Sequence, residues 1–130
     1  MIFLKNVVIK FFEYGFCLTV TLVTVVTYFH FCELDGVGGA FFSLTEGDFT
    51  SYSVNYSDRK FKSIEVGMDI VQVNEIMGAP IGEFRIEKTG AKYFSYSKAR
   101  KGRSAGYRKR IIFFDNNNRV SEVRSEFYPE

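Results

Sequence analysis

The sequence predicts an α+β domain in the C-terminal part of the chain: two short helices packed on an antiparallel meander of three or four strands, preceded by a transmembrane helix. Three observations lead to this prediction. Residues 14–32 are uncharged and mostly apolar, capping residues bracket two short apolar stripes between 57 and 80, and strand-like segments joined by turns follow. The chain divides accordingly into a membrane anchor or signal sequence (1–32), a linker (33–56) and the α+β domain (57–130).

The amino-acid composition argues against several classes of protein. The 130 residues carry 17 Lys and Arg against 15 Asp and Glu, and the resulting net charge of +2 is too small to indicate a nucleic-acid-binding protein. A hydrophobic share of 46% with only two prolines excludes global disorder. The single histidine, His30, and both cysteines, Cys17 and Cys32, lie in the leader. This argues against a zinc site or a Cys–His catalytic pair in the domain, and we expect no metal and no cofactor.

The leader favours a retained membrane anchor. As a helix, residues 14–32 would be about 29 Å long, close to the ~30 Å thickness of a hydrocarbon core. Lys5 and Lys10 precede this span, whereas Glu33 and Asp35 follow it. The positive-inside rule then puts the N-terminus in the cytoplasm and the C-terminal domain in the periplasm, as a single-pass protein of the cell membrane.

Two other interpretations of the leader stay open. The small residues Gly38-Gly39-Ala40 suit a cleavage site, and cleavage would give an exported or outer-membrane-associated protein. The alternation of β-branched residues in 18–26 (LTVTLVTVV) fits a buried strand. Lipid attachment at Cys32 is disfavoured because no small residue precedes this cysteine.

A short helix is expected directly after the linker. Residues 33–56 are rich in Gly and Ser and have no sustained hydrophobic period, which is typical of a connecting segment. Ser57 can then cap a helix that directs Phe61 and Ile64 inward, and Gly67 ends it.

The second helix has a signal at each end. Asp69 and Gln72 match a capping-box variant, Gly78 suits the position just after the last turn, and Pro80 prevents continuation. The apolar stripe between these signals is predicted to lie in the core and comprises Ile70, Val73, Ile76 and Met77.

The rest of the chain reads as strands. Residues 83–88 suit a short edge strand, 91–98 carry an aromatic run, and 107–114 end in a strongly apolar segment. The turn at 115–118 (DNNN) tolerates the positive φ of a tight hairpin, which leads to a last strand over 119–127. Sequential strands with short turns predict an antiparallel meander.

The run Ser63-Ile64-Glu65-Val66-Gly67-Met68, continued by Val73 and Met77-Gly78-Ala79-Pro80, resembles the SmpA/OmlA (BamE-like) family over about residues 57–127. This family is the small component of the outer-membrane β-barrel assembly machinery. The motif has a structural meaning: a turn, a core side chain, a helix end and a rigid exit into the sheet. Its residues, Gly67, Met68, Val73, Gly78 and Pro80, are not chemically reactive, so the resemblance implies a binding or scaffolding module.

One concentrated charge signal remains. The segment 98–110 (KARKGRSAGYRKR) has no acidic residue and carries seven cations: Lys98, Arg100, Lys101, Arg103, Arg108, Lys109 and Arg110. A solvated loop with a charged strand edge is one interpretation. Anionic lipid, an acidic protein surface and another polyanion are the alternatives, and a location outside the cytoplasm argues against nucleic acid.

These observations predict a non-enzymatic cell-envelope protein. Its BamE-like domain would dock on an envelope protein partner in outer-membrane protein assembly, and the N-terminal helix would hold it at the membrane. The alternative is an exported soluble inhibitor or ligand-binding module of similar α+β fold. No nucleophile–base motif in the sequence supports an enzyme.

Overall fold

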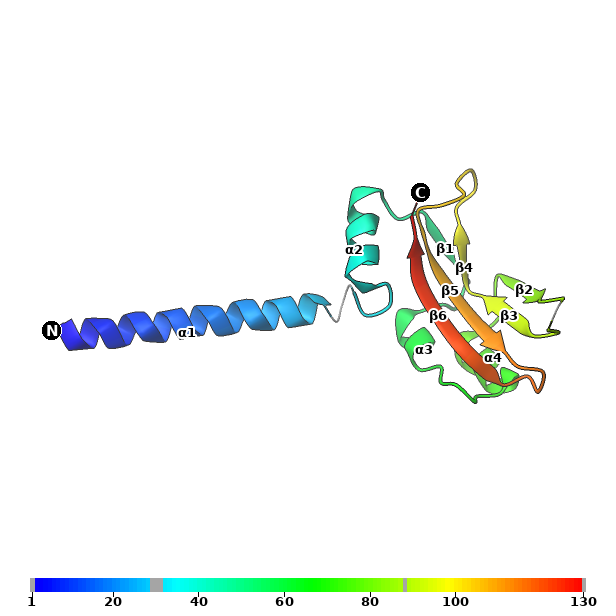
Figure 1. Cartoon of the computed structure of the whole chain (residues 1–130), viewed down its shortest axis with the longest axis horizontal. Helices are drawn as coiled ribbons and strands as arrows, with labels where there is room; N and C mark the ends of the chain where they lie inside the picture. The colour runs from blue at the N-terminus through cyan, green and yellow to red at the C-terminus, as the bar shows by residue number, and fades with distance from the viewer. Residues whose placement is uncertain (1, 29–31, 88, 130) are drawn as a thin grey trace.

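The computed structural model describes residues 2–28, 32–87 and 89–129. Figure 1 shows a long N-terminal helix that leads into an α+β domain. The elements, in chain order, are α1 (Ile2–Thr27), α2 (Gly36–Thr45), β1 (Thr50–Tyr52), α3 (Asp58–Lys62), α4 (Ile70–Met77), β2 (Gly82–Arg85), β3 (Lys92–Ser95), β4 (Ser97–Ala99), β5 (Tyr107–Phe114) and β6 (Val120–Tyr128).

The predicted membrane anchor is wrong. Among the described residues, no helix combines the length and the apolarity needed to cross a membrane. The uncharged part of α1 runs only over 14–27, about 21 Å at 1.5 Å per residue, and four threonines dilute it. The single-pass topology, the periplasmic placement derived from it and the membrane attachment through this helix fall with the anchor. The alternative of a buried strand over 18–26 is also wrong because α1 covers it, and His30 lies outside the described residues.

The antiparallel α+β architecture of the domain is as predicted. A four-stranded sheet has the order β2-β3-β5-β6, and β1 pairs with β4 in a separate two-stranded sheet. Every pairing is antiparallel, and consecutive strands of the larger sheet are neighbours, so this sheet is a meander. The predicted strand over 91–98 is divided between β3 and β4, which belong to different sheets.

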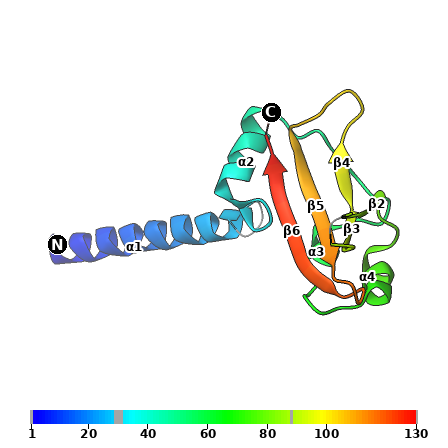
Figure 2. The same cartoon turned by 45° about the vertical axis from the view of Figure 1, so that its right-hand side comes forward.

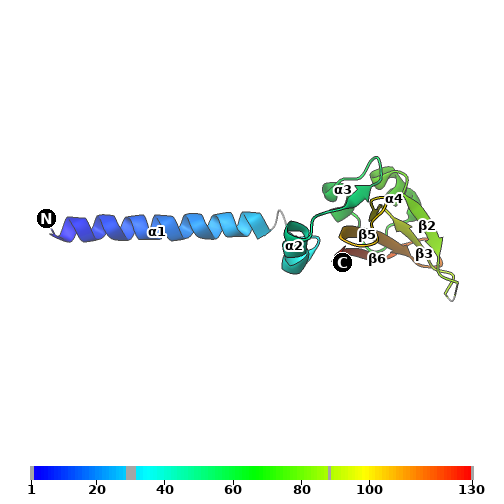
Figure 3. The same ribbon diagram turned by 90° about the horizontal axis from the view of Figure 1, so that it is seen from above.

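The described helices of the domain cover one face of the sheet. Figure 3 shows α3 and α4 on one side of β5 and β6. Alternate residues of β5 point to this inner face, and Ile112 and Phe114 are fully buried there beside Val73 and Met77 of α4. The other members of the core cluster are Phe61, Ile64, Phe94, Tyr96 and Val120.

Local signals fix the ends of α3 and α4. The Ser57 side chain accepts a hydrogen bond from the Lys60 N–H, which caps α3. At the start of α4, the Asp69 carboxylate accepts from the Gln72 N–H, and the Gln72 side chain accepts from the Asp69 N–H, so the predicted capping box is confirmed. Gly78 ends the helix with a φ of 73°.

The last hairpin is tied to the turn between the helices. Asn118 has a φ of 59°, and the Asp115 carboxylate accepts backbone N–H groups within the turn. The Gly67 N–H donates to the Val120 carbonyl at 2.8 Å, and the Val120 N–H donates to the Met68 carbonyl at 2.7 Å. The Gly-Met pair of the motif therefore joins the helices to the start of β6.

The segment expected as a linker, 33–56, contains α2 and β1. Figures 1 and 2 both show α2 beside β6, at the end of the sheet away from α4. Gly39 makes this approach possible, because a Cβ on it would lie 2.9 Å from the Cβ of Phe127. Tertiary contact, rather than an amphipathic period, holds this helix in place.

Candidate protein-binding surface

The structure divides the predicted basic cluster into three groups, and the first is buried. Arg110 follows the alternation of β5 inward, and its side chain is fully buried next to the apolar core. Arg108 lies one step along the same face and keeps 21% of its side chain exposed. These two cations are directed into the molecule, so they are not part of a solvated loop.

Asp35 pairs with both arginines. Its side chain is fully buried. It accepts hydrogen bonds from Arg110 Nη1 at 2.6 Å and Nη2 at 3.0 Å, and from Arg108 Nη1 at 2.5 Å. Arg108 Nε also donates to Asp48 at 2.8 Å. Two guanidinium groups thus converge on one carboxylate in the fork geometry that Arg and carboxylate favour.

Tyr56 completes the hydrogen bonding of Arg110. The Tyr56 hydroxyl accepts from Arg110 Nε at 3.0 Å and donates to Asp58 at 2.5 Å. Burial and the bond to Asp58 raise the pKa of Tyr56 well above its usual value. The pKa of Arg110 is also raised, because the hydrogen bonds and charge of Asp35 outweigh the effect of burial. The network holds Arg108 and Arg110 in place through charge-assisted hydrogen bonds.

The second group of cations rests on aromatic rings. Lys109 Nζ lies 3.8 Å from the centre of the Tyr128 ring and 3.5 Å from a Glu126 oxygen. The Arg103 guanidinium lies 4.2 Å from the centre of the Phe49 ring. The third group has exposed side chains in β4 and in the turn after it, and consists of Lys98, Arg100 and Lys101.

A row of aromatic rings crosses the face of the sheet that α3 and α4 leave uncovered, which we call the outer face. Phe84 of β2 stacks on Tyr93 of β3 at 4.9 Å between ring centres, and Tyr93 meets Phe113 of β5 at 5.4 Å. The strand registers place these residues directly opposite one another. Phe84 is 49% exposed, so the row is in contact with solvent.

Charged side chains on the outer face are paired. Arg124 lies over the Phe113 ring at 4.7 Å and bonds Glu122 at 2.7 Å, while Lys109 faces Glu126. Among the residues that the structure describes, two cations and two acids therefore leave the face without net charge. The outer face is distinguished by its aromatic rings, and Arg124 stacks on Phe113 at one end of the row.

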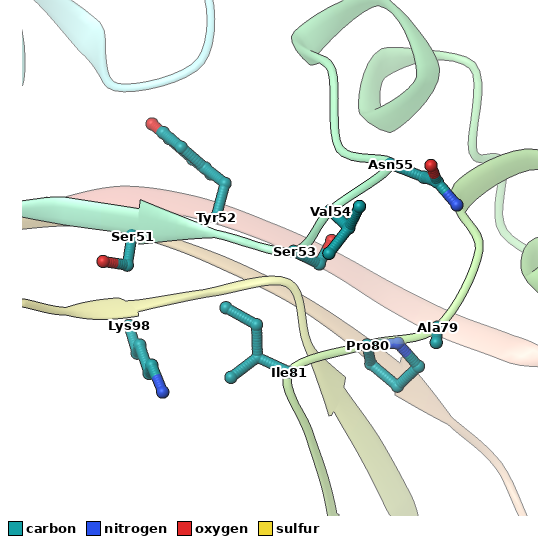
Figure 4. Close-up of a pocket in the computed structure, with 9 residues that line it drawn as sticks. All are labelled: Ser51, Tyr52, Ser53, Val54, Asn55, Ala79, Pro80, Ile81 and Lys98. Carbon is teal, nitrogen blue, oxygen red and sulfur yellow. The ribbon is translucent and has the colours of Figure 1, made fainter.

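A shallow groove of about 320 Å³ lies at the edge of the domain (Figure 4). It is formed where the chain after β1 passes the connection between α4 and β2. Val54, Pro80 and Ile81 give it an apolar lining, and Lys98 stands at its rim. The groove therefore brings together Pro80 of the motif and Lys98 of the basic cluster, which are separated in the sequence.

The described parts of the chain contain no group of three or more His, Cys, Asp or Glu side chains that could hold a metal ion. Cys17 and Cys32 are free thiols.

The family model described as the outer membrane protein assembly factor BamE domain matches residues 54–124. The chain belongs to the BamE domain family. The resemblance found in the sequence is thereby confirmed, and the description of the family connects the BamE domain with outer-membrane protein assembly. No curated protein matches the chain. A solved structure, described as a putative osmotically inducible lipoprotein OsmE, shares 20% identity over 57% of this chain and 83% of that one, with a TM-score of 0.43.

Within the BamE domain, the motif residues have structural positions. Val73 is fully buried, Met68 is half-buried against the core, and Gly67 and Gly78 occupy turns with positive φ. The matched residues also include Arg108, Arg110 and the aromatic row, whereas Asp35 and α2 lie before the matched segment.

The sequence did not reveal two features of the BamE domain, the buried Arg110 and the aromatic row. Arg110 counted as one cation of a cluster, although Ile112 and Phe114 at steps of two already placed it on the buried face of a strand. The aromatic row was hidden because its three members lie on three different strands. Aromatic residues at alternate positions of each strand were the available signal; their alignment depends on the register, which the sequence does not give.

Proposed function

We propose that this chain is a non-enzymatic cell-envelope protein whose BamE domain binds a partner protein in outer-membrane protein assembly. The observation that carries the proposal is the aromatic row of Phe84, Tyr93 and Phe113 on the outer face of the sheet. The process, outer-membrane protein assembly, is inferred from the family, and the binding surface is inferred from this face of the sheet.

The chemistry of the outer face favours a protein over an anionic lipid. Aromatic residues and arginine are enriched in the centres of protein interfaces and dominate their binding energy. The rings of Phe84, Tyr93 and Phe113 already hold one another in place, so little side-chain entropy is lost when a partner covers them. Because the charges on this face are paired, long-range attraction to a negatively charged membrane contributes little there.

The state of the ionisable groups supports a role without catalysis. The arginines of the buried network are held charged, and the pKa of Tyr56 is moved away from neutrality by burial first and by Asp58 second. General acid–base catalysis requires the opposite, a group whose pKa is close to the working pH.

The exposed cations Lys98, Arg100 and Lys101 are a second, weaker contact in this proposal. They are the part of the basic cluster whose side chains remain exposed around β4. We assign them to an anionic surface next to the docked partner, either an acidic protein patch or lipid headgroups. Vesicles with and without phosphatidylglycerol distinguish the two, because only the lipid assignment requires binding to the anionic vesicles.

The proposal is tested by removing the aromatic row in cells that depend on this chain. The double variant Phe84→Ala and Phe113→Ala should lower the amount of folded β-barrel protein in the outer membrane, measured by heat-modifiable gel mobility. Val71→Ala is the matched control, because Val71 is an exposed apolar residue of α4, which covers the opposite face of the sheet. Normal melting of the purified variants excludes loss of fold as the cause. Equal β-barrel levels in the two variants would contradict the proposal.

A further inference from the structure

We propose that Arg108 and Arg110 form a carboxylate-binding site of the BamE domain, which Asp35 occupies in the resting chain and an acidic side chain of the partner occupies after α2 is displaced. The inference rests on the proposed function, because the second occupant belongs to the docked partner. It adds a second contact, on the opposite face of the sheet from the aromatic row.

The site has the geometry of a carboxylate receptor. Arg110 presents Nη1 and Nη2 to the two oxygens of one carboxylate at 2.6 and 3.0 Å, and Arg108 adds a third donor at 2.5 Å. The Tyr56 hydroxyl orients the Arg110 guanidinium from its other side through Nε. Bidentate pairing of this kind selects a planar carboxylate over a spherical anion.

The receptor and its occupant come from different parts of the chain. Tyr56, Arg108 and Arg110 lie inside the matched BamE domain, whereas Asp35 precedes it. Within the domain, Asp58 approaches Arg110 Nε only to 3.9 Å, and its side chain is 58% exposed. The domain therefore holds a buried guanidinium that requires a carboxylate from outside, because a buried charge without its partner is strongly unfavourable.

The attachment of α2 allows displacement. Asp35 sits at the N-cap of α2, yet its side chain makes no capping hydrogen bond, because it is committed to the arginines. On the sheet side, Gly39 provides a close contact with Phe127. The other side of α2 is a stripe of exposed apolar residues at helical spacing, Val37, Phe41 and Leu44. Besides the Asp35 carboxylate and the glycine contact, α2 is held by a hydrogen bond of 3.3 Å from Arg108 Nη2 to the Ser43 hydroxyl and by the packing of Leu34 against the core. None of these contacts involves the apolar stripe, which is a second surface that the helix can offer to a partner.

A peptide copy of the segment tests the site in trans. The probe is the fluorescent peptide ELDGVGGAFFSLT, residues 33–45, and the control peptide carries Asn in place of Asp35. The full chain is held in non-ionic detergent. Because Asp35→Asn vacates the receptor, this variant should bind the probe at least tenfold more tightly than the wild type does. Its affinity for the control peptide should be the same as that of the wild type. Equal binding by the variant and the wild type, or equal binding of the two peptides, would overturn the proposal.

A second measurement follows displacement in the wild-type chain. Saturating probe should accelerate hydrogen exchange of the α2 amides, because the probe takes the place of Asp35. Unchanged exchange at saturation would refute displacement. Arg110→Gln added to Asp35→Asn should abolish the gain in binding. If that variant does not fold, Arg108→Gln, at a partly exposed position, serves instead.

These experiments use no partner protein, so their outcome is separate from that of the aromatic row. If the peptide does not bind but Phe84→Ala and Phe113→Ala still lower the level of β-barrel protein, the carboxylate site is refuted and the proposed function stands. If the peptide binds as expected but the two Phe→Ala substitutions have no effect, the aromatic docking face is refuted and the carboxylate site stands.

Discussion

Gly78 provides the sharpest test of how the motif shapes the domain. It ends α4 with φ 73° and ψ −165°, a region that residues with a side chain rarely enter. Its N–H donates to the Asn74 carbonyl at 2.8 Å, which ties this conformation to the last turn of the helix. A Cβ added here would lie 2.9 Å from Nδ2 and 3.2 Å from Cβ of Asn55.

The expected effect of Gly78→Ala follows from these two terms. Backbone strain in this region costs about 1–3 kcal/mol. The Asn55 amide can rotate away from the new methyl group, so the backbone term dominates and the total should be about 2 kcal/mol. In a domain of this size, each kcal/mol lowers the melting temperature by about 4–8 °C. Gly78→Ala should therefore lower it by about 8–16 °C.

Thermal unfolding followed by circular dichroism measures this shift. Gly38→Ala is the control, because Gly38 lies in a helix with open space around its Cβ and alanine should stabilise it by about 0.5–1 kcal/mol. Adding Asn55→Ala to Gly78→Ala removes the 2.9 Å contact with the amide and leaves the backbone strain, so little recovery of the melting temperature is expected. An unchanged melting temperature for Gly78→Ala would refute the strained helix end.

Four further results are expected. Tyr96→Phe should stabilise the domain by about 1 kcal/mol in urea titrations, because the buried hydroxyl has no hydrogen-bond partner among the described residues. Burial alone would raise the pKa of Asp48, but hydrogen bonds from Thr50 and Arg108 lower it on balance. Asp48 therefore stabilises the fold above its ordinary pKa of 3.8 and loses this effect as the pH falls below it, so Asp48→Asn should flatten the drop in stability between pH 5 and pH 3. Arg110→Gln should cost about 3–5 kcal/mol, because it takes from the buried Asp35 carboxylate its fully buried cation and leaves only the partly exposed Arg108, a loss that calorimetry would detect. A variant in which the exposed cations Lys98, Arg100 and Lys101 are changed to Gln should have a free energy of unfolding within about 0.5 kcal/mol of the wild-type value.

The C-terminal elements could be predicted because short-range chemistry specifies them. The capping box of Asp69 and Gln72, the glycine at 78 and the turn over 115–118 are local signals, and each occurs where the sequence placed it. Such signals act over a few residues and need no knowledge of the fold.

Other features depend on contacts between distant segments, so local patterns could not reveal them. The sequence of α2, GVGGAFFSLT, has low helix propensity and no polar face, and its helix forms against Phe127 of β6. The pairing of Asp35 with Arg110 spans 75 positions. Length and apolarity of residues 14–32 suggested a membrane span, but the helix includes Lys10 and Glu13 and its uncharged part is too short.

Site-specific photo-crosslinking tests the central claim most directly. A photoreactive phenylalanine analogue at position 84 lies on the outer face, whereas the same analogue at position 71 is exposed on α4, on the opposite side of the sheet. Irradiation of intact cells should attach an envelope protein of the outer-membrane assembly process to the chain through position 84 and leave position 71 without this adduct. Adducts of equal yield at the two positions, or an adduct at position 71 alone, would contradict the assignment of the aromatic row as the docking face.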